Sequence, residues 1–306
     1  MTMNYRGLGF AFLGVLIFSF TLPMVKLALP GFSPWTLTFG RAAIAGVLAI
    51  AFLKYSKVPF PDRKLLRPLF VTAGGIVVGW PILTTLALQE TTSAHAAVIT
   101  AGLPLVTAIL AVTRLHEHVP KAFWVAALTG TFTLVVYAWI HGGQEGASLK
   151  ADLYLLGAVV AAAIGYVEGA ALSKVMPGWH VVSWCVVLTL PISLPYFAIS
   201  LWLGSENHTV TPIALLAFLF TAFGSMYFGF FAWYRGLAEL GVAKGSQVQL
   251  IQSLLTLLWS AWLLNESVTG QTLLAASVVV ICIAVTQRLR VTSQLRKNSR
   301  IREPKR

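Results

Sequence analysis

Residues 209–234 read TVTPIALLAFLFTAFGSMYFGFFAWY and contain no charged side chain. A helix needs about 20 consecutive, mostly apolar residues to cross the hydrocarbon core of a bilayer. This stretch is longer than that, and it is rich in Phe and Leu throughout. It therefore predicts a transmembrane helix.

The remainder of the chain has the same character. Hydrophobic residues make up 57% of the sequence and charged residues 10%, with a mean hydropathy of +0.79, whereas an ordinary soluble domain carries about 25% charged residues. Charge-poor runs separated by short polar breaks predict ten spans. These spans are expected at residues 7–29, 33–54, 67–88, 92–113, 120–140, 152–174, 179–203, 211–234, 243–264 and 268–288. The sequence thus predicts an all-α integral membrane protein with ten transmembrane helices.

The net charge of +12 is a topology signal rather than a signature of nucleic-acid binding. With the N-terminus placed in the cytoplasm, 19 of the 22 Lys and Arg residues fall in cytoplasmic connections or in the C-terminal segment from Arg288 onward. Cytoplasmic loops carry such an excess of basic residues. We therefore expect a multi-pass protein of the bacterial cytoplasmic (inner) membrane with both termini cytoplasmic. The basic tail, residues 289–306, is expected to rest near anionic lipid headgroups.

The two halves of the chain resemble each other. When Glu90 is aligned with Glu239, Glu117 falls on Glu266, so the same acid precedes the fifth expected span of each half. The predicted repeats are residues 7–140 and 152–288. Five spans are an odd number, so the second repeat is expected to enter the membrane from the opposite side. Inverted repeats can open a central site to each face in turn, which is a mechanism of transport.

The order of these features resembles the drug/metabolite transporter superfamily, and specifically EamA-type permeases built from two five-helix repeats. The motifs that carry the resemblance are Pro23 with Lys26, Ser33-Pro34 leading to Arg41, Ala87-Leu88 before residues 94–104, and the repeat-ending Glu117 and Glu266. The resemblance implies an exporter or importer of small metabolites such as amino acids or related amphipathic compounds, with a cavity between the repeats; of the two directions, we expect export. Glu168 departs from the pattern, because many relatives carry a neutral residue there.

Two charged residues within expected spans are candidate substrate-binding residues. An acid in hydrocarbon is costly and normally faces a wet cavity or a partner. Glu168 is expected to act in the cavity, as a counter-ion to a substrate amine or as a proton-binding group, with a structural pairing to Arg41 or a neighbouring hydroxyl as the alternative. Arg41 has five donors that suit a carboxylate of the substrate or of the protein. Because Glu168 is a candidate proton-binding group, protons are a candidate coupling ion.

Amides and aromatic residues complete the candidate site. Gln249 and Gln252 lie on one helical face and require hydrogen-bond partners in the membrane, either in a cavity or between helices. Tyr166, Trp80 and Tyr227 lie in the middle of expected spans and could line a pocket, although aromatic residues in membranes often serve packing alone.

We therefore expect a secondary transporter that moves small metabolites by alternating access, with the lipid bilayer and a small-molecule substrate as partners. The sequence indicates no catalytic residues, metal ligands, cofactor or nucleic-acid partner, and it lacks a GxxxxGK[ST] phosphate-binding loop. Two alternatives remain open at this stage. One is a membrane-embedded enzyme acting on lipid-like substrates, for which His116-Glu117-His118 is the nearest cluster, and the other is a non-transporting scaffold or sensor.

Overall fold

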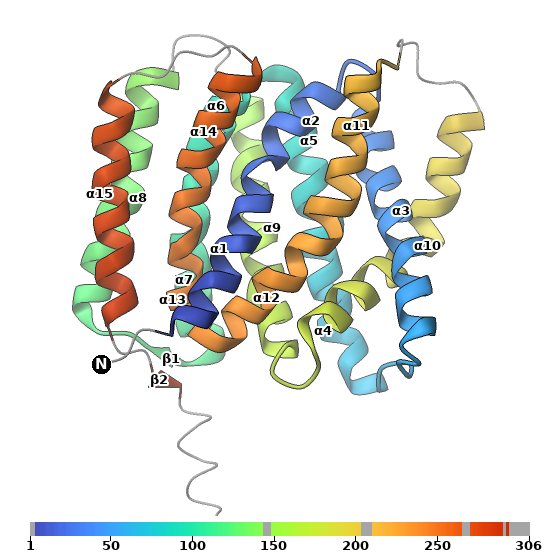
Figure 1. Cartoon of the computed structure of the whole chain (residues 1–306), viewed down its shortest axis with the longest axis horizontal. Coiled ribbons are helices and arrows are strands. Elements are labelled where there is room, and N and C mark those ends of the chain that lie inside the picture. The colour runs from blue at the N-terminus through green and yellow to red at the C-terminus, as the bar shows by residue number, and fades with distance from the viewer. Residues whose placement is uncertain (1–3, 143–147, 203–209, 265–269, 290–291, 294–306) are drawn as a thin grey trace, which may run out of the picture.

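The computed structural model describes residues 4–142, 148–202, 210–264, 270–289 and 292–293. Within them the chain is a bundle of helices that run between two opposite ends (Figure 1). The predicted basic tail, residues 289–306, lies almost entirely outside the described residues, and Glu266 lies outside them as well.

In the first half of the described chain, several helices are broken into consecutive pieces. The elements are α1 (Tyr5–Ser19), α2 (Thr21–Ala28), α3 (Pro34–Tyr55), α4 (Arg63–Ala73), η1 (Gly74–Gly79), α5 (Trp80–Glu90), α6 (Ser93–Ile99), η2 (Thr100–Gly102), α7 (Leu103–Leu115), β1 (Glu117–His118) and α8 (Lys121–Gly142).

The second half follows a similar sequence of elements. They are α9 (Leu149–Leu172), α10 (Gly178–Trp202), α11 (Pro212–Phe220), η3 (Thr221–Phe228), α12 (Gly229–Leu240), α13 (Val242–Ser246), η4 (Gln247–Gln249), α14 (Leu250–Leu264), α15 (Gly270–Arg288) and β2 (Thr292–Ser293).

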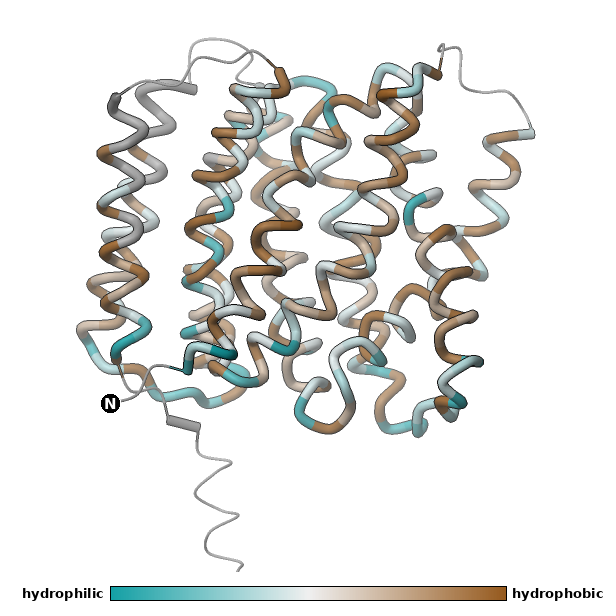
Figure 2. The backbone as a smooth tube through the Cα atoms, viewed as in Figure 1, coloured by the Kyte–Doolittle hydropathy of each residue, from teal (hydrophilic) through white to brown (hydrophobic). Residues whose placement is uncertain are grey.

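The described residues hold eight helices that are long and apolar enough to cross a membrane. They coincide with eight of the ten expected spans, and α8 and α15 occupy the positions of the fifth and tenth. Figure 2 shows hydrophobic stretches (brown) along the coloured parts of the helices, with many of the hydrophilic stretches (teal) at the lower end of the bundle. Large apolar side chains such as Ile192 and Trp262 are exposed on the outside of the bundle, as expected where lipid is the solvent. The prediction of an all-α membrane protein is confirmed.

Local sequence signals place the helix starts. Ser33 precedes Pro34 at the start of α3, and its Oγ accepts a hydrogen bond from the Thr36 N–H at 3.2 Å. Thr211 and Pro212 repeat this arrangement at the start of α11. The hydroxyl satisfies a backbone donor that has no partner within the helix, and Pro fits the first turn because it lacks an N–H.

Helices of the two halves pack against each other in pairs. The most extensive contacts join α3 to α10, α1 to α12, α8 to α15 and α5 to α9. The helix breaks also occur at corresponding places in the halves. A π-helical segment interrupts α4–α5 at η1 and α11–α12 at η3, and a 3₁₀ turn interrupts α6–α7 at η2 and α13–α14 at η4.

One end of the bundle is rich in basic residues. The start of α1, the end of α3, the start of α4 and the β1–β2 pair all lie there (Figure 1). The strands pair antiparallel, with Glu117 opposite Ser293 and His118 opposite Thr292. This arrangement brings the chain just after α15 against the connection between α7 and α8.

Candidate functional site

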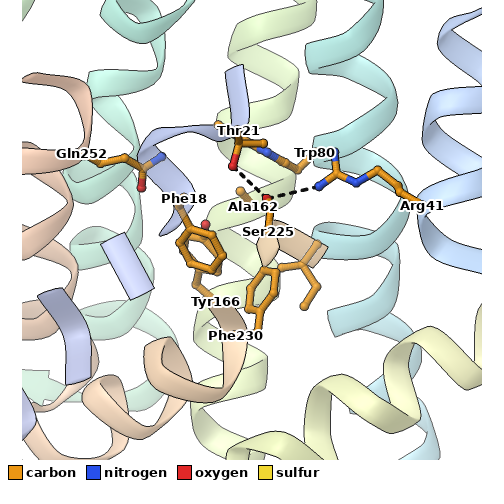
Figure 3. Close-up of a pocket in the computed structure, with 10 residues that line it drawn as sticks. Phe18, Thr21, Arg41, Trp80, Ala162, Tyr166, Ser225, Phe230 and Gln252 are labelled. Atoms are coloured by element: carbon orange, nitrogen blue, oxygen red, sulfur yellow. Dashed lines mark hydrogen bonds between the residues drawn. The ribbon is translucent and has the colours of Figure 1, made fainter. Parts of the chain in front are cut away.

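A small cavity lies in the interior of the bundle, where both halves contribute side chains (Figure 3). Its lining comes from α1, α2, α3, η1, α5, α9, η3, α12 and α14. The lining residues are Phe18, Thr21, Arg41, Ile76, Trp80, Ala162, Tyr166, Ser225, Phe230 and Gln252.

Breaks in the helices present several of these residues to the cavity. Helix α1 ends at Ser19 and α2 begins at Thr21, and the backbone oxygen of Ser19 accepts a hydrogen bond from Thr256 Oγ1 at 2.8 Å. The π-helical segments η1 and η3 contribute Ile76 and Ser225. Such interruptions in helices occur frequently at functional sites, because they redirect side chains and free backbone groups.

Arg41 provides the positive charge of the cavity. The residue is only 2% exposed, and its Nη2 donates to Ser225 Oγ over a long distance of 3.4 Å. Ser225 Oγ in turn shares a hydrogen bond of 2.8 Å with Thr21 Oγ1. The Nε and Nη1 atoms of Arg41 are buried without a hydrogen-bond partner in the described part of the chain. A buried donor without a partner costs about 1–3 kcal/mol, and a charged donor costs more.

Three glutamines at the 3₁₀ turn η4 and the start of α14 place further polar atoms in the interior. Gln252 lines the cavity, and its Oε1 is buried without a partner among the described residues. Gln249 approaches the Tyr166 hydroxyl, but neither of its amide atoms makes a hydrogen bond of standard geometry. Gln247 Nε2 donates to the Pro104 backbone oxygen at 3.3 Å, while its Oε1 has no described partner. Buried polar atoms are normally satisfied, so this concentration indicates a place for a polar ligand or water.

Aromatic rings form the apolar wall. The rings of Phe18 and Phe230 have centroids 4.9 Å apart, and Tyr166 contacts Trp233 edge-on at 5.4 Å. The Tyr234 hydroxyl donates to the Gly165 backbone oxygen at 3.1 Å. A side chain at Gly169 would overlap the Tyr234 ring, so glycine is required there for α9 and α12 to approach each other.

The cavity is nearly closed in this conformation. The space open to the centre of a water molecule is about 10 Å³, which suits about one water. A metabolite does not fit unless the surrounding helices or aromatic side chains move apart.

Four of the seven candidate residues lie together around the cavity: Arg41, Trp80, Tyr166 and Gln252. Gln249 lies next to them through Tyr166. Tyr227 is fully buried outside the lining, and its hydroxyl pairs with Ser183 Oγ at 2.8 Å.

Glu168 lies outside the cavity lining. Its Oε1 is 2.5 Å from Arg114 Nε, in an ion pair that joins α9 to α7 near the basic end of the bundle. The alternative pairing of Glu168 with Arg41 is not formed in this structure. Sequence reasoning expected these two charges to share a site because both lie within apolar spans, and it could not assign Arg114 as a partner because Arg114 lies at a span end.

Several lining residues were absent from the sequence prediction. Thr21, Ser225, Phe18 and Phe230 are ordinary residues of apolar spans, and nothing in their spacing distinguishes them from packing residues. Thr21 directly follows the helix break at Phe20, and Ser225 lies in the π-helical segment η3; neither distortion is encoded in a recognisable motif.

Glu117, in the cluster considered for an enzyme, has a structural partner. Its two carboxylate oxygens accept hydrogen bonds from the backbone N–H groups of Val242 and Ala243, at 3.0 and 2.9 Å. The carboxylate is buried, and both of its oxygens are occupied by these N–H groups at the start of α13. The described residues contain no group of three or more His, Cys, Asp or Glu side chains suited to a metal ion.

Comparison with known proteins gives three findings. The EamA-like transporter family matches the chain twice, at residues 5–139 and 149–287. A protein of Bacillus subtilis (strain 168) described as "Uncharacterized transporter YdeK" is 42% identical over 279 residues, which cover 90% of this chain and 95% of that protein. A protein of known crystal structure shares the fold with a TM-score of 0.73 at 20% identity, covering 94% of this chain and 99% of that one.

Proposed function

The chain belongs to the EamA-like transporter family, and on that premise we propose that it exports a small metabolite across the bacterial cytoplasmic membrane by alternating access. Family membership makes it a membrane transporter with a small-molecule substrate. The substrate, the direction of transport and the mechanism belong to the proposal.

The observation that carries the proposal is the central cavity. Five lining residues come from the first half of the chain and five from the second. Secondary transporters bind their substrate at such an interface between repeats, near the middle of the membrane. The unpartnered polar atoms of Arg41 and Gln252 supply the binding groups, and the aromatic wall supplies an apolar surface.

We assign the chain ten spans arranged as two inverted repeats, residues 7–140 and 152–288. Two observations support this assignment. The family matches each half separately, and the π-helical and 3₁₀ breaks fall at corresponding places in both halves. The basic end of the bundle faces the cytoplasm in this assignment, as the distribution of Lys and Arg requires, so both termini are cytoplasmic.

Alternating access requires the two ends of the bundle to open in turn. The nearly closed cavity fits an intermediate between the two open forms. Ion pairs join the helices at both ends: Arg114 with Glu168 at the basic end, and Lys150 with Glu90 at the opposite end. We propose that these contacts exchange as the halves rock.

Proton coupling is part of this proposal and centres on Glu168. Protonation of its carboxylate would remove the charge that holds Arg114 and so loosen the contact between α7 and α9. The test is uptake into proteoliposomes under an imposed pH gradient, with Glu168→Gln compared to wild type. If the variant shows the same dependence on the gradient as the wild type, Glu168 is not the coupling group.

The transport proposal itself is tested by comparing the metabolites of cells that overproduce the protein with those of cells that overproduce a Gln252→Leu variant. Gln252→Leu keeps the volume of the side chain but removes its polar atoms from the cavity. We expect at least one metabolite to accumulate in the medium only with the wild-type protein. Identical metabolite profiles for wild type, variant and empty cells would contradict the proposal.

A further inference from the structure

Arg41 is a buried cation whose counter-charge is not supplied by the described protein. Within the residues that the structure describes, no carboxylate lies within salt-bridge distance of its guanidinium. The described acids are engaged or exposed elsewhere: Glu90 with Lys150, Asp152 with His95, Glu168 with Arg114, Glu239 with Arg235, Glu117 with backbone N–H groups, and Asp62 exposed before α4.

A guanidinium in this position is unfavourable by itself. It has left water for a low-dielectric interior without gaining an opposite charge. Its one protein hydrogen bond, to Ser225, is long at 3.4 Å, and its Nε and Nη1 atoms have no described partner. The cavity beside it has room for about one water, which is too little to hydrate a cation fully. An opposite charge is therefore what the described residues do not give Arg41, and an anion of metabolite size could supply it once the surrounding helices or side chains move apart.

The geometry of the donors selects the kind of anion. The unpartnered Nε and Nη1 each lie beside an N–H of Nη2, which has a second hydrogen besides the one it gives to Ser225. Such a pair of parallel N–H groups matches the two oxygens of a carboxylate. Among the described residues that line the cavity, Arg41 is the only cation, so a single negative charge balances it. A carboxylate carries one negative charge, whereas phosphate groups carry closer to two at neutral pH.

The residues on the opposite side of the cavity indicate the chemistry of the rest of the ligand. Gln252 lies across from Arg41, with Thr21, Ser225 and the aromatic rings between them (Figure 3). Its free Oε1 can accept a hydrogen bond, so it suits a hydroxyl or N–H group. No acid is present among the described lining residues, so a cationic amine would meet the guanidinium without any compensating negative charge from them.

From these contacts we infer that the cargo is a small monocarboxylate with an apolar body, and that Arg41 binds its carboxylate. This inference rests on the transport proposed above and narrows it to one substrate class. It replaces the expectation that Glu168 serves as counter-ion to a substrate amine, because Glu168 is engaged with Arg114 outside the lining.

The experiment compares ligands that differ only in charge. Purified protein is tested against a panel of aliphatic and aromatic monocarboxylates, each with its neutral amide and its amine analogue, and against chloride and inorganic phosphate. The measurements are the thermal midpoint of unfolding and the Kd. In the wild-type protein, we expect carboxylates to bind and stabilise while their amides and amines do not.

Variants test the role of Arg41 directly. Arg41→Gln should weaken carboxylate binding about 10- to 100-fold, because a hydrogen bond to a charged group is lost along with the charge. Arg41→Lys keeps the positive charge but lacks the planar fork, so its affinity for carboxylates should lie between those of the wild type and Arg41→Gln. Arg63→Gln makes the same substitution at an exposed arginine at the start of α4 and serves as the matched control, with unchanged affinity. If Arg41→Gln gives no folded protein, the wild-type series of carboxylate, amide and amine decides the question alone.

Each outcome has a distinct meaning. Amines or amides that bind as well as carboxylates, a panel in which no carboxylate binds, or stabilisation by chloride or phosphate alone would overturn the inference. Uptake of the bound carboxylate into proteoliposomes separates this inference from the transport proposal. Binding without uptake would contradict transport and leave the anion site standing. Uptake of panel compounds regardless of their charge would contradict the anion site and leave transport standing.

Discussion

Removing the carboxylate of Glu117 should destabilise the protein by breaking a contact between its two halves. The side chain is only 3% exposed, and it accepts the backbone N–H groups of Val242 at 3.0 Å and Ala243 at 2.9 Å. These N–H groups begin the helical run from α13 to α14 and have no partner within it. The negative charge also lies at the positive end of the helix dipole.

The size of the effect follows from these two hydrogen bonds. A hydrogen bond to a charged group contributes about 1.5–3 kcal/mol, so Glu117→Ala should cost about 3–6 kcal/mol. Glu117→Gln keeps one neutral acceptor and should cost about half of that. Glu239→Gln is the matched control, because Glu239 forms partly exposed ion pairs with Arg235 and Arg6. It should cost at most about 0.5 kcal/mol.

The protein contains its own reporter for this assay. Both cysteines, Cys185 and Cys282, are free and buried, so a thiol-reactive dye should label them only when the purified protein unfolds. The expected order of thermal midpoints is wild type and Glu239→Gln highest, Glu117→Gln lower, and Glu117→Ala lowest. A Glu117→Ala protein that melts with the Glu239→Gln control would refute the assignment of Glu117 as a cap that joins the halves.

Three further predictions follow from packing and topology. Gly169→Ala should sharply reduce the yield of folded protein, because the new Cβ would overlap the Tyr234 ring. The control Gly9→Ala should leave the yield unchanged, because nothing lies within 4 Å of its new Cβ. Equal yields of the two variants would contradict the close approach of α9 and α12. Cys185 and Cys282 should react with a thiol reagent far more slowly in native than in denatured protein, as counted by mass spectrometry. Fast labelling of the native protein would contradict their burial in α10 and α15. A reporter enzyme that works only in the cytoplasm should show activity when it is fused to the C-terminus of the chain. Activity only from a reporter that works in the periplasm would contradict the proposed orientation.

The helices were predictable from sequence because lipid imposes a strong rule on each span separately. Backbone groups in hydrocarbon must be satisfied within the helix, and the side chains must be apolar over about 20 residues. The expected span at residues 152–174 therefore corresponds to α9, and that at 33–54 to α3, within a few residues. The family was predictable for the same reason, because the order of spans and the charges between them are properties of the linear chain.

The cavity was predictable only in part. Arg41 and Gln252 could be identified in advance because polar groups are conspicuous within apolar spans. The partners of charged residues were not predictable, and Glu168 illustrates this. Its position within a span suggested the cavity, whereas the packing of α7 against α9 gives it Arg114.

The sequence by itself thus determined that the chain is an all-α membrane protein of two similar halves, because hydrophobic length and charge distribution act locally. Only the tertiary structure decided which side chains meet in the interior. A residue such as Ser225 reaches Arg41 because a π-helical segment turns it inward and because α3 and η3 pack together. Contacts of this kind depend on the relative rotation and crossing of distant helices, which no local pattern of residues specifies.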